Sequence, residues 1–249
     1  MNFKNIKILC NLNGIHLIKK DKVKSTMEIA KNNSVSNKKM VLAISKSQTK
    51  GRGRSGSKWI SNKGNIFFTL KVYPNNKFNL LHEIGIIISL QIHQTIEKYI
   101  TDKVKLKWPN DIFIDNKKVG GIIIENNLEK NNNYCLIGVG LNFISSPNIH
   151  NYETTFLRRY NKYIKYEFFL EKLIKNIIVN YNLWLINKDN IFLTQYKNNL
   201  MYLNKKIKVK LHNNKIMKGK FIDITKEGYL ILFSNNKKNI IISGSIFLI

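Results

Sequence analysis

A glycine-rich, basic segment that is followed by a strand rather than a helix constrains the fold of this chain most. Residues 47–61 read SQTKGRGRSGSKWIS and match the dinucleotide fingerprint G-x-G-x-x-G through Gly51, Gly53 and Gly56. In a Rossmann fold a helix must begin at these glycines, because the pyrophosphate binds at the helix N-terminus. Here KWISNKG and a further strand pattern follow. The segment therefore excludes a Rossmann domain and predicts a loop between two strands.

The composition of this loop indicates what it can bind. Its glycines permit close backbone approach, and the forked donors of Arg52 and Arg54 suit the oxygens of phosphate groups. A loop of this kind can close over a triphosphate, while the alternative on composition alone is a mobile surface hairpin.

The hydrophobic pattern changes after Pro147. Before it, strand patterns alternate with one short helix, which begins near Ser25 or Thr26, and with one long, largely buried helix over Leu80–Ile100. The predicted strands are IHLIKK (15–20), MVLAIS (40–45), NIFFTLKV (65–72), KLKW (105–108), IFID (112–115), VGGIIIE (119–125) and NYCLIGVGLNF (133–143). The segment DNKK predicts a hairpin between two of them.

The rest of the chain predicts a second unit. Residues 152–200 read as helices rich in Phe, Tyr and Leu, and short strands separated by turn residues follow from Asn204 onward. We therefore expect an α+β protein with helices on a mixed sheet over residues 1–200. A small all-β domain, a barrel or a sandwich, should follow over residues 201–249.

Composition narrows the class of protein further. A hydrophobic fraction of 43% is ordinary for a globular protein, and no apolar run approaches the ~20 residues that span a bilayer. The segment Met1–Cys10 lacks the features of a secretory signal. Two cysteines, Cys10 and Cys135, provide neither a disulfide framework nor a paired metal site. We expect a reduced, cytoplasmic setting without a membrane partner.

The charge of the chain raises the question of nucleic acid. Forty-two Lys and Arg stand against 15 Asp and Glu, a formal net charge of +27. The lysines are spread along the whole chain and occur beside Asn and Ile, as in NKKM, NNKF and NNKK. A generally solvated surface explains this distribution better than a specific nucleic-acid face, which remains the alternative.

Two further segments carry polar side chains at strand ends. In KWPNDIFIDNKKVGGIIIE, Asp111 follows a strand and a proline, Lys118 begins the next strand, and Gly120 and Gly121 leave space against the sheet. In IGVGLNF, Asn142 ends an apolar strand, where its amide can reach a phosphate or a hydrated metal ion. In isolation, a charged hairpin and a strand with two glycines are more often structural than functional.

Taken together, GRGRSGSKW, KWPNDIFIDNKKVGG and IGVGLN, in this order and at these separations, resemble the three signatures of the biotin–protein ligase family. Ser25–Met27 and Gln48 match that family's biotin-binding positions. The resemblance covers nearly the whole chain, because the all-β tail is similar to the family's SH3-like C-terminal β-barrel. It implies a catalytic domain of the class II aminoacyl-tRNA synthetase-like type.

The resemblance also implies which residues form the site. The implied biotin-binding residues are Ser25, Thr26, Met27, Gln48, Arg52, Gly53, Arg54, Lys118 and Gly120. The implied ATP- and adenylate-binding residues are Arg52, Arg54, Trp59, Asn110, Lys118 and Asn142. The implied catalytic residues are Lys118, Arg54 and Asp111. No direct protein ligand to a metal is expected, and Mg²⁺ should arrive with ATP and lie near Asn142.

In that scheme biotin is first activated as its adenylate and then passed to a lysine of a carrier protein. Lys118 would hold the biotin carboxylate, while Arg52 and Arg54 close on the phosphates, since two anions meet only if cations neutralise them. Trp59 would stack on adenine. Asp111 would orient the carrier lysine and accept its proton, because a free lysine has a pKa near ~10.4.

Two positions depart from the family pattern. Ser57 stands where another arginine is common, and Ser245 stands in GSIFLI where a glutamate is common. About two dozen residues precede Ser25, so the winged-helix DNA-binding domain of repressor-type members is expected to be absent and the protein monofunctional.

The implied partner is the biotin carboxyl carrier protein of acetyl-CoA carboxylase, and we expect no specific nucleic acid and a monomer or a weak homodimer. A lipoate–protein ligase is the nearest rival in fold and chemistry. A basic nucleic-acid-binding protein is supported by the charge and the β tail. A degenerate member that only binds is conceivable because of Ser57 and Ser245.

Overall fold

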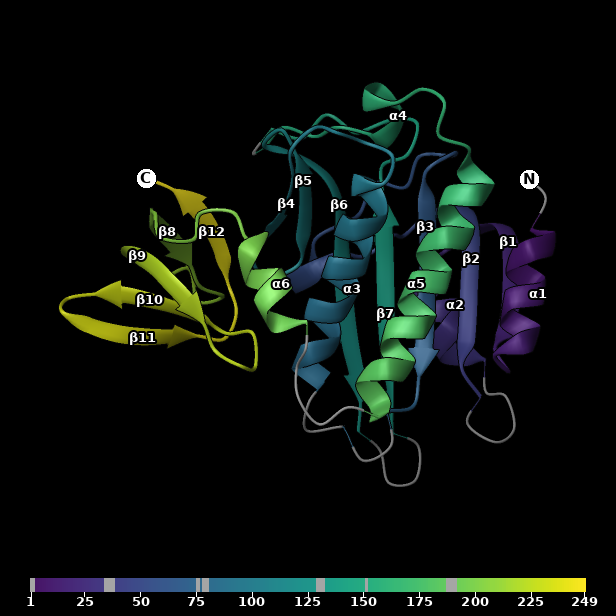
Figure 1. Cartoon of the computed structure of the whole chain (residues 1–249), viewed down its shortest axis with the longest axis horizontal. Coiled ribbons are helices and arrows are strands. Elements are labelled where there is room, and N and C mark those ends of the chain that lie inside the picture. The colour runs from purple at the N-terminus through teal and green to yellow at the C-terminus, as the bar shows by residue number, and fades with distance from the viewer. Residues whose placement is uncertain are drawn as a thin grey trace.

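Two β-sheets organise the chain in the computed structural model, which describes residues 3–33, 39–74, 77, 81–128, 133–150, 152–186 and 192–249 (Figure 1). The large sheet has the strand order β1-β2-β3-β7-β6-β5-β4; β1 and β2 are parallel and the other neighbours are antiparallel. The C-terminal sheet has the antiparallel order β11-β10-β9-β8-β12. The α+β class with a mixed sheet is thereby confirmed.

The elements follow one another much as the hydrophobic pattern predicts. The strands of the large sheet are β1 (His16–Val23), β2 (Val41–Gln48), β3 (Ile66–Val72), β4 (Val104–Lys107), β5 (Asp111–Ile114), β6 (Lys117–Asn127) and β7 (Tyr134–Leu141). Those of the C-terminal sheet are β8 (Lys206–Lys210), β9 (Ile216–Ile224), β10 (Leu230–Ser234), β11 (Lys237–Ile241) and β12 (Ser245–Leu248). The helices are α1 (Lys4–Leu12), α2 (Thr26–Asn32), α3 (Leu81–Glu97), α4 (Leu157–Tyr160), α5 (Tyr166–Ile186) and α6 (Leu193–Asn198), with a 3₁₀ turn η2 (Arg54–Gly56).

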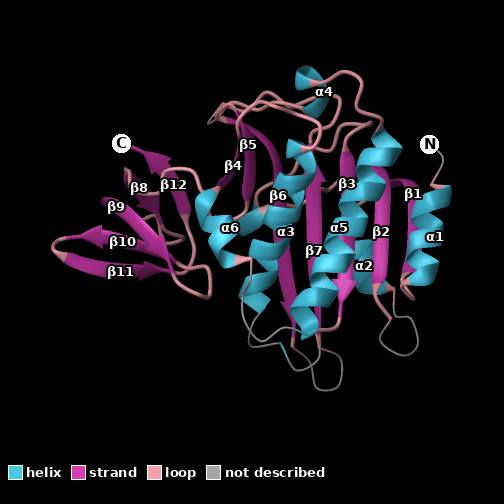
Figure 2. Cartoon of the chain, viewed as in Figure 1, coloured by secondary structure: helices cyan, strands magenta, loops and turns pink. Residues whose placement is uncertain are grey.

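The two faces of the large sheet are covered unequally. Successive residues of a strand point to opposite faces. Leu42 and Ile44 of β2 belong to the main core, which includes buried residues of α1, α3 and α5, while Ala43 packs with Met27 and Ala30 of α2 on the other side. Figure 2 shows α3 and α5 in front of the sheet and α2 behind it. The face of the large sheet on which α2 packs is therefore only partly covered by helices.

Local signals fix the ends of two elements near this open face. The Ser25 hydroxyl accepts a hydrogen bond from the Met27 N–H at 3.2 Å and caps α2, as its sequence predicts. Asp115 and Asn116 adopt positive φ angles of 47° and 62°, which a two-residue hairpin turn requires, and they join β5 to β6.

The C-terminal sheet is anchored to the rest of the chain by specific contacts. The Trp108 indole N–H donates to the carbonyl of Gly228 at 2.9 Å, and Lys197 of α6 forms an ion pair with Asp223 at 2.8 Å. Buried residues of this sheet, Val209 and Phe221 among them, belong to the same hydrophobic cluster as the core of the large sheet. The predicted all-β tail is thus present as a five-stranded sheet fixed beside β4 and β5 (Figure 1).

The N-terminal helix α1 was not predicted from the sequence. Helix α1 buries Ile6 and Cys10, four residues apart, and packs against β1 and α5. The pattern KNIKILCNL is short and has few apolar residues on one face, so it is a weak signal. In the part of the chain that the structure describes, no helix is both long and apolar enough to cross a bilayer.

Candidate active site

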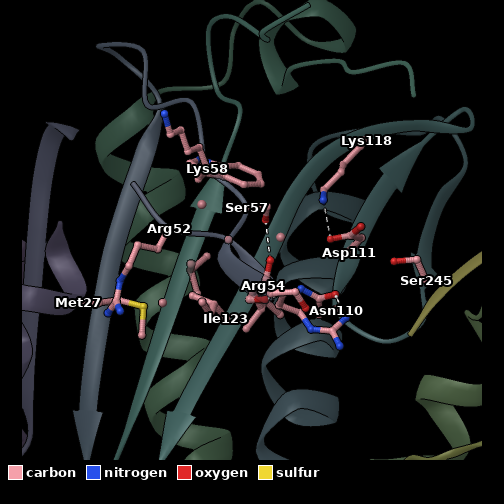
Figure 3. A pocket seen from close by; sticks show the side chains of 18 of the residues that line it. Met27, Arg52, Arg54, Ser57, Lys58, Asn110, Asp111, Lys118, Ile123 and Ser245 are labelled. Carbon is pink, nitrogen blue, oxygen red and sulfur yellow. Dashed lines mark hydrogen bonds and ion pairs between the residues drawn. The ribbon is translucent and has the colours of Figure 1, made fainter. Parts of the chain in front are cut away.

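A cavity of about 470 Å³ lies between the α2-bearing face of the large sheet, the glycine-rich loop and the C-terminal sheet (Figure 3). The structure thus brings together residues that lie far apart in the sequence. The residues proposed for the site that line the cavity are Ser25, Thr26, Met27, Gln48, Arg52, Gly53, Arg54, Trp59, Asn110, Asp111 and Lys118.

Glycines form the floor of this cavity. Gly121 of β6 and Gly140 of β7 are cross-strand partners and face the same side of the sheet. A Cβ at Gly140 would lie 2.5 Å from Cε2 of Trp59, and one at Gly121 would lie 3.3 Å from Cζ3. Any side chain at Gly140 would therefore displace the indole, so the glycine is needed for Trp59 to lie against the sheet.

Lys118 and Asp111 face each other across this floor. The Lys118 Nζ lies 2.7 Å from Oδ1 of Asp111, and the two side chains are 13% and 25% exposed. The ammonium group also lies 5.6 Å from the ring centroid of Trp59 and 5.2 Å from that of Tyr152. Aromatic faces attract cations, so the charge of Lys118 is held at one place by a carboxylate and two rings.

A β-bulge explains why Lys118 reaches the cavity. Gly121 faces the cavity, so in a regular strand Lys118, three residues away, would point to the opposite face. The register of β5 and β6 shifts between Ile112 and Phe113, and Lys118 pairs with Phe113 on the same side as Asp111. Bulges commonly re-aim a side chain next to a functional site.

A group of hydrogen-bonded polar side chains lines the cavity at the N-terminus of α2. The Gln48 Oε1 accepts from the Thr26 backbone N–H at 2.8 Å and from its hydroxyl at 3.1 Å. The Gln48 amide donates to Ser61 at 3.0 Å, and the buried Thr69 hydroxyl donates to Thr26 at 2.9 Å. These partners fix the rotamers of two side chains that line the cavity.

The glycine-rich loop lies over the floor in an irregular conformation. Its backbone closes on itself through hydrogen bonds from Gly53 to Ser57 and from Trp59 to Gly51, at 2.8 and 3.0 Å. Ser55 has a φ angle of 52°, in the left-handed region that is uncommon for residues with a side chain. A strand and not a regular helix follows the glycines, as predicted from the sequence, and this is incompatible with a Rossmann domain.

The two loop arginines have different partners. Arg54 donates to Oδ1 of Asn110 at 3.1 Å, beside the Lys118–Asp111 pair (Figure 3). Burial lowers the pKa of Arg54, and the nearby charge of Asp111 opposes this shift. Arg52 instead forms an ion pair with Glu125 at 3.1 Å. Each guanidinium group has further N–H donors that these contacts do not use.

The C-terminal sheet completes the cavity, and most of its contribution was not predicted. Ser245 lines the cavity, as do four residues of the β8–β9 hairpin that were missed, namely Lys210, Leu211, His212 and Asn214. The Ser55 hydroxyl lies 3.1 Å from Nδ1 of His212 and joins the loop to this hairpin. Nothing in KIKVKLHNN marks these residues, because only the packing of the second sheet brings them to the site.

Two residues proposed for the site lie outside the lining. Gly120 faces the packed side of β6, where a Cβ would lie 2.3 Å from Cδ2 of Leu141. Asn142 is buried and donates to the carbonyl of Thr155 at 3.0 Å, while its Oδ1 has no hydrogen-bond partner among the described residues. Their roles in binding biotin and ATP remain predictions.

The cavity is strongly cationic. Among the described residues, its lining carries the basic side chains Arg52, Arg54, Lys58, Lys118 and Lys210 and one carboxylate, Asp111. Such a lining favours a polyanion, and a low-dielectric site strengthens the attraction. Among the described residues there is no cluster of three or more His, Cys, Asp or Glu side chains that could hold a metal ion.

Comparisons with known proteins assign this chain to a class of ligases. The family model "Biotin/lipoate A/B protein ligase family" matches residues 20–142, and the model "Biotin protein ligase C terminal domain" matches residues 202–249. A structure of the biotin protein ligase from Aquifex aeolicus in complex with biotin and ATP superposes with a TM-score of 0.79 at 26% identity. The superposition covers 94% of this chain and 98% of that one. The chain belongs to the biotin–protein ligase family.

Curated relatives match over part of their length. The bifunctional ligase/repressor BirA of Bacillus subtilis is 33% identical over 141 residues, which are 54% of this chain and 42% of that protein. Biotin–protein ligase 2 of Arabidopsis thaliana is 34% identical over 110 residues, 41% of this chain and 32% of that protein. The match thus spans about two fifths or less of these two relatives.

Proposed function

We propose that this chain is a biotin–protein ligase, which activates biotin with ATP as biotinyl-5′-AMP and transfers it to a lysine of a carrier protein. The observation that carries the proposal is the position of the Lys118–Asp111 pair. It lines the same cationic cavity as the hydrogen-bonded group of Thr26 and Gln48 and the arginines of the glycine-rich loop. Three chemically different parts of a ligand can therefore bind side by side.

The polar side chains at the N-terminus of α2 suit biotin better than lipoate. A ureido ring has two N–H donors and a carbonyl acceptor, whereas a dithiolane ring has neither. The amide of Gln48 and the hydroxyls of Ser25 and Thr26 offer both kinds of partner at the cavity wall. A buried polar group that loses its partner costs free energy, so such a site discriminates against lipoate. Met27 would pack against the apolar part of biotin.

Adenylation would take place at Lys118. An oxygen of the biotin carboxylate attacks the α-phosphorus of ATP, the bond to the β-phosphate oxygen breaks, and pyrophosphate leaves. The ammonium of Lys118 would hold the carboxylate and the charge that develops on the α-phosphate. Arg54 would leave Asn110 and Arg52 would leave Glu125 to bind phosphate oxygens, with Trp59 stacked on adenine.

Mg²⁺ would arrive with ATP, since the cavity offers it little. Asn142 Oδ1, which has no hydrogen-bond partner among the described residues, is a suitable hard ligand, but the side chain is buried and does not line the cavity. For Asn142 to lie near a hydrated ion, its side chain would have to become accessible from the cavity. When bound, the ion would neutralise the pyrophosphate leaving group.

In the transfer step the amine of a carrier lysine attacks the carbonyl carbon of the adenylate, and AMP leaves. Asp111 faces the cavity with a quarter of its side chain exposed, so an incoming ammonium can reach it. Its carboxylate would orient the lysine and accept the proton that the amine loses. We propose the biotin carboxyl carrier protein of acetyl-CoA carboxylase, in the cytoplasm, as the partner.

A direct assay tests the proposed function. The chain is incubated with a biotin carboxyl carrier domain, biotin and Mg-ATP, and the product is detected with streptavidin, with lipoate in place of biotin as the control. Biotin-dependent exchange of pyrophosphate into ATP measures the first step without any carrier. The proposal requires both signals; if lipoate is attached instead, or neither reaction occurs, it is wrong.

A further inference from the structure

The C-terminal sheet carries far more positive charge than its fold requires. Residues 201–249 contain ten lysines and two acidic residues. Of these two, Asp223 pairs with Lys197, and Glu227 lies in the turn between β9 and β10, where a hydrogen bond from Thr225 lowers its pKa. The lysines of this sheet thus far outnumber the carboxylates that could pair with them.

Five of these lysines stand together on one face of β8 and β9. The alternation of β8 is strict, with Lys206, Lys208 and Lys210 exposed and the residues between them buried. Across the ladder, Lys206 is paired with Lys220 and Lys208 with Lys218. Residues directly opposite each other in antiparallel strands point to the same face, so the five ammonium groups share one surface. We call this surface the lysine face.

Like charges placed directly opposite each other destabilise a sheet. Within the described part of the chain, none of these five lysines forms an ion pair with a carboxylate, and Lys208 lies 5.4 Å from the ring centroid of Phe247 on the neighbouring strand β12. The repulsion between the paired lysines of β8 and β9 is therefore not offset by a carboxylate within the described part of the chain. An acidic partner bound to this face would relieve it.

The lysine face runs directly into the candidate active site. Lys210 and its cross-strand partner Ser245 both line the cavity. Phe247 lies 5.2 Å from the Nζ of Lys107, which in turn is the cross-strand partner of Asp111. A macromolecule bound on the face would therefore have part of its surface at the mouth of the cavity.

We propose that the lysine face is the docking surface for the protein substrate, an acidic carrier domain that inserts its target lysine into the cavity. The proposal rests on the proposed function, because only a ligase of this kind needs a second protein at this place. Two observations carry it, the charge of an exposed face without acidic partners and its continuity with the cavity. Complementary charge speeds the encounter of two proteins and fixes their orientation, so its loss should slow association and thereby weaken binding.

Nucleic acid fits this face less well. Single strands bind sheets by stacking bases on exposed aromatic rings, in addition to phosphate contacts. Phe247 has ammonium groups of Lys107 and Lys208 within 5.2 and 5.4 Å of its ring centroid, so lysines occupy its surroundings. Continuity with the cavity would also have no purpose for such a ligand.

The test variant removes the two like-charge pairs but leaves Lys210, which lines the cavity, unchanged. It carries Lys206→Gln, Lys208→Gln, Lys218→Gln and Lys220→Gln. We expect the KM for an isolated biotin carboxyl carrier domain of net negative charge to rise about 10-fold or more at low salt, with kcat nearly unchanged. At about 0.5 M salt, where the Debye length falls to roughly 4 Å, the KM values of the variant and the native chain should become similar. Biotin-dependent pyrophosphate exchange, which needs no carrier, should be unaltered.

The matched control removes four exposed lysines from other surfaces and changes the net charge equally. It carries Lys7→Gln, Lys20→Gln, Lys98→Gln and Lys175→Gln. We expect its KM for the carrier domain to change by less than about twofold, since steering by the net field alone is weak at this charge difference. An equal rise of KM in both variants would show that only net charge matters and would overturn the proposal.

Two further readouts separate the remaining outcomes. If the face variant keeps its KM for the carrier but loses retention of a labelled single-stranded oligonucleotide, the face binds nucleic acid and the proposal is wrong. If the native chain performs no pyrophosphate exchange, the proposed function fails instead. Fluorescence anisotropy of the labelled carrier domain then decides the docking question by itself: weaker binding by the face variant than by the control supports the surface, and equal binding excludes it.

Discussion

The floor of the cavity and the loop above it position their functional groups in different ways. On the floor, Lys118 is held by Asp111, and Thr26 by Gln48, at distances between 2.7 and 3.1 Å, from strands or from the start of a helix. In the loop, Arg54 belongs to a short irregular turn and bonds to Asn110. The floor is thus preorganised for a ligand, while the loop arginines are proposed to change their partners on binding.

This difference predicts different consequences of mutation. Groups that are already in place contribute to the chemical step through electrostatic preorganisation. Groups that move into place contribute to retention of the reactive intermediate and exclusion of water. Variants of the floor should therefore affect formation of the adenylate, and variants of the loop should affect its escape.

The largest effect is expected from the floor. Lys118→Ala should lower the rate of biotin-dependent pyrophosphate exchange by about 10²–10³-fold, as removal of a group that stabilises developing negative charge does elsewhere. The fold should persist, because the side chain lies at the cavity and not in the core. Lys117→Ala is the matched control, since the adjacent lysine pairs at 2.8 Å with the exposed Glu153. Near-normal exchange in Lys118→Ala would remove this residue from the mechanism.

The next effect sharpens the role of the loop. Arg54→Gly removes the hydrogen bond to Asn110 and the cation over the site, so the adenylate should escape roughly 10–100-fold faster, in line with 1.5–3 kcal/mol for a charged hydrogen bond. Release is measured as biotinylation of a bystander protein such as serum albumin. Arg52→Gly, whose partner Glu125 lies outside the cavity lining, provides a comparison. Labelling that stays confined to the carrier would contradict the account of the loop as a lid.

A smaller effect is expected at the hydrogen-bonded group of Thr26, Gln48 and Thr69. Thr26→Val keeps the shape of the side chain but removes its hydroxyl, so Gln48 and Thr69 each lose a partner. The KM for biotin should rise about 5-fold, which corresponds to about 1 kcal/mol for one hydrogen bond, with little change in kcat. Thr194→Val, on the surface of α6, controls for the substitution itself. A fall in kcat without a change in KM would place Thr26 in the chemical step.

The smallest effect concerns the contact between the loop and the C-terminal sheet. His212→Ala removes the 3.1 Å hydrogen bond to Ser55, which is exposed to solvent. Such a bond stabilises by about 1 kcal/mol or less, so escape of the adenylate should increase by less than about 5-fold. The bystander assay used for Arg54→Gly measures it. An effect as large as that of Arg54→Gly would mean that the C-terminal sheet, rather than Asn110, holds the loop closed.

Local patterns in the sequence predicted nearly all the elements. The alternation of β8, the apolar runs of β2, β3 and β7, and the Ser25 cap of α2 depend on neighbours in sequence, which is why they can be identified without the fold. Helix α1 escaped because its apolar stripe is short, and burial against α5 rather than propensity stabilises it.

For the site, the sequence determined which chemical groups are present: the glycines that bring Trp59 to the sheet, the loop arginines, and the Lys118 and Asp111 side chains. Only the tertiary structure decided how they meet. A one-residue bulge turns Lys118 to the side of Asp111, and regular alternation would have placed it on the other face. Docking of a separate sheet brings Lys210, His212 and Ser245 to the cavity. Register and docking depend on the packing of surfaces distant in sequence, and no local pattern encodes these.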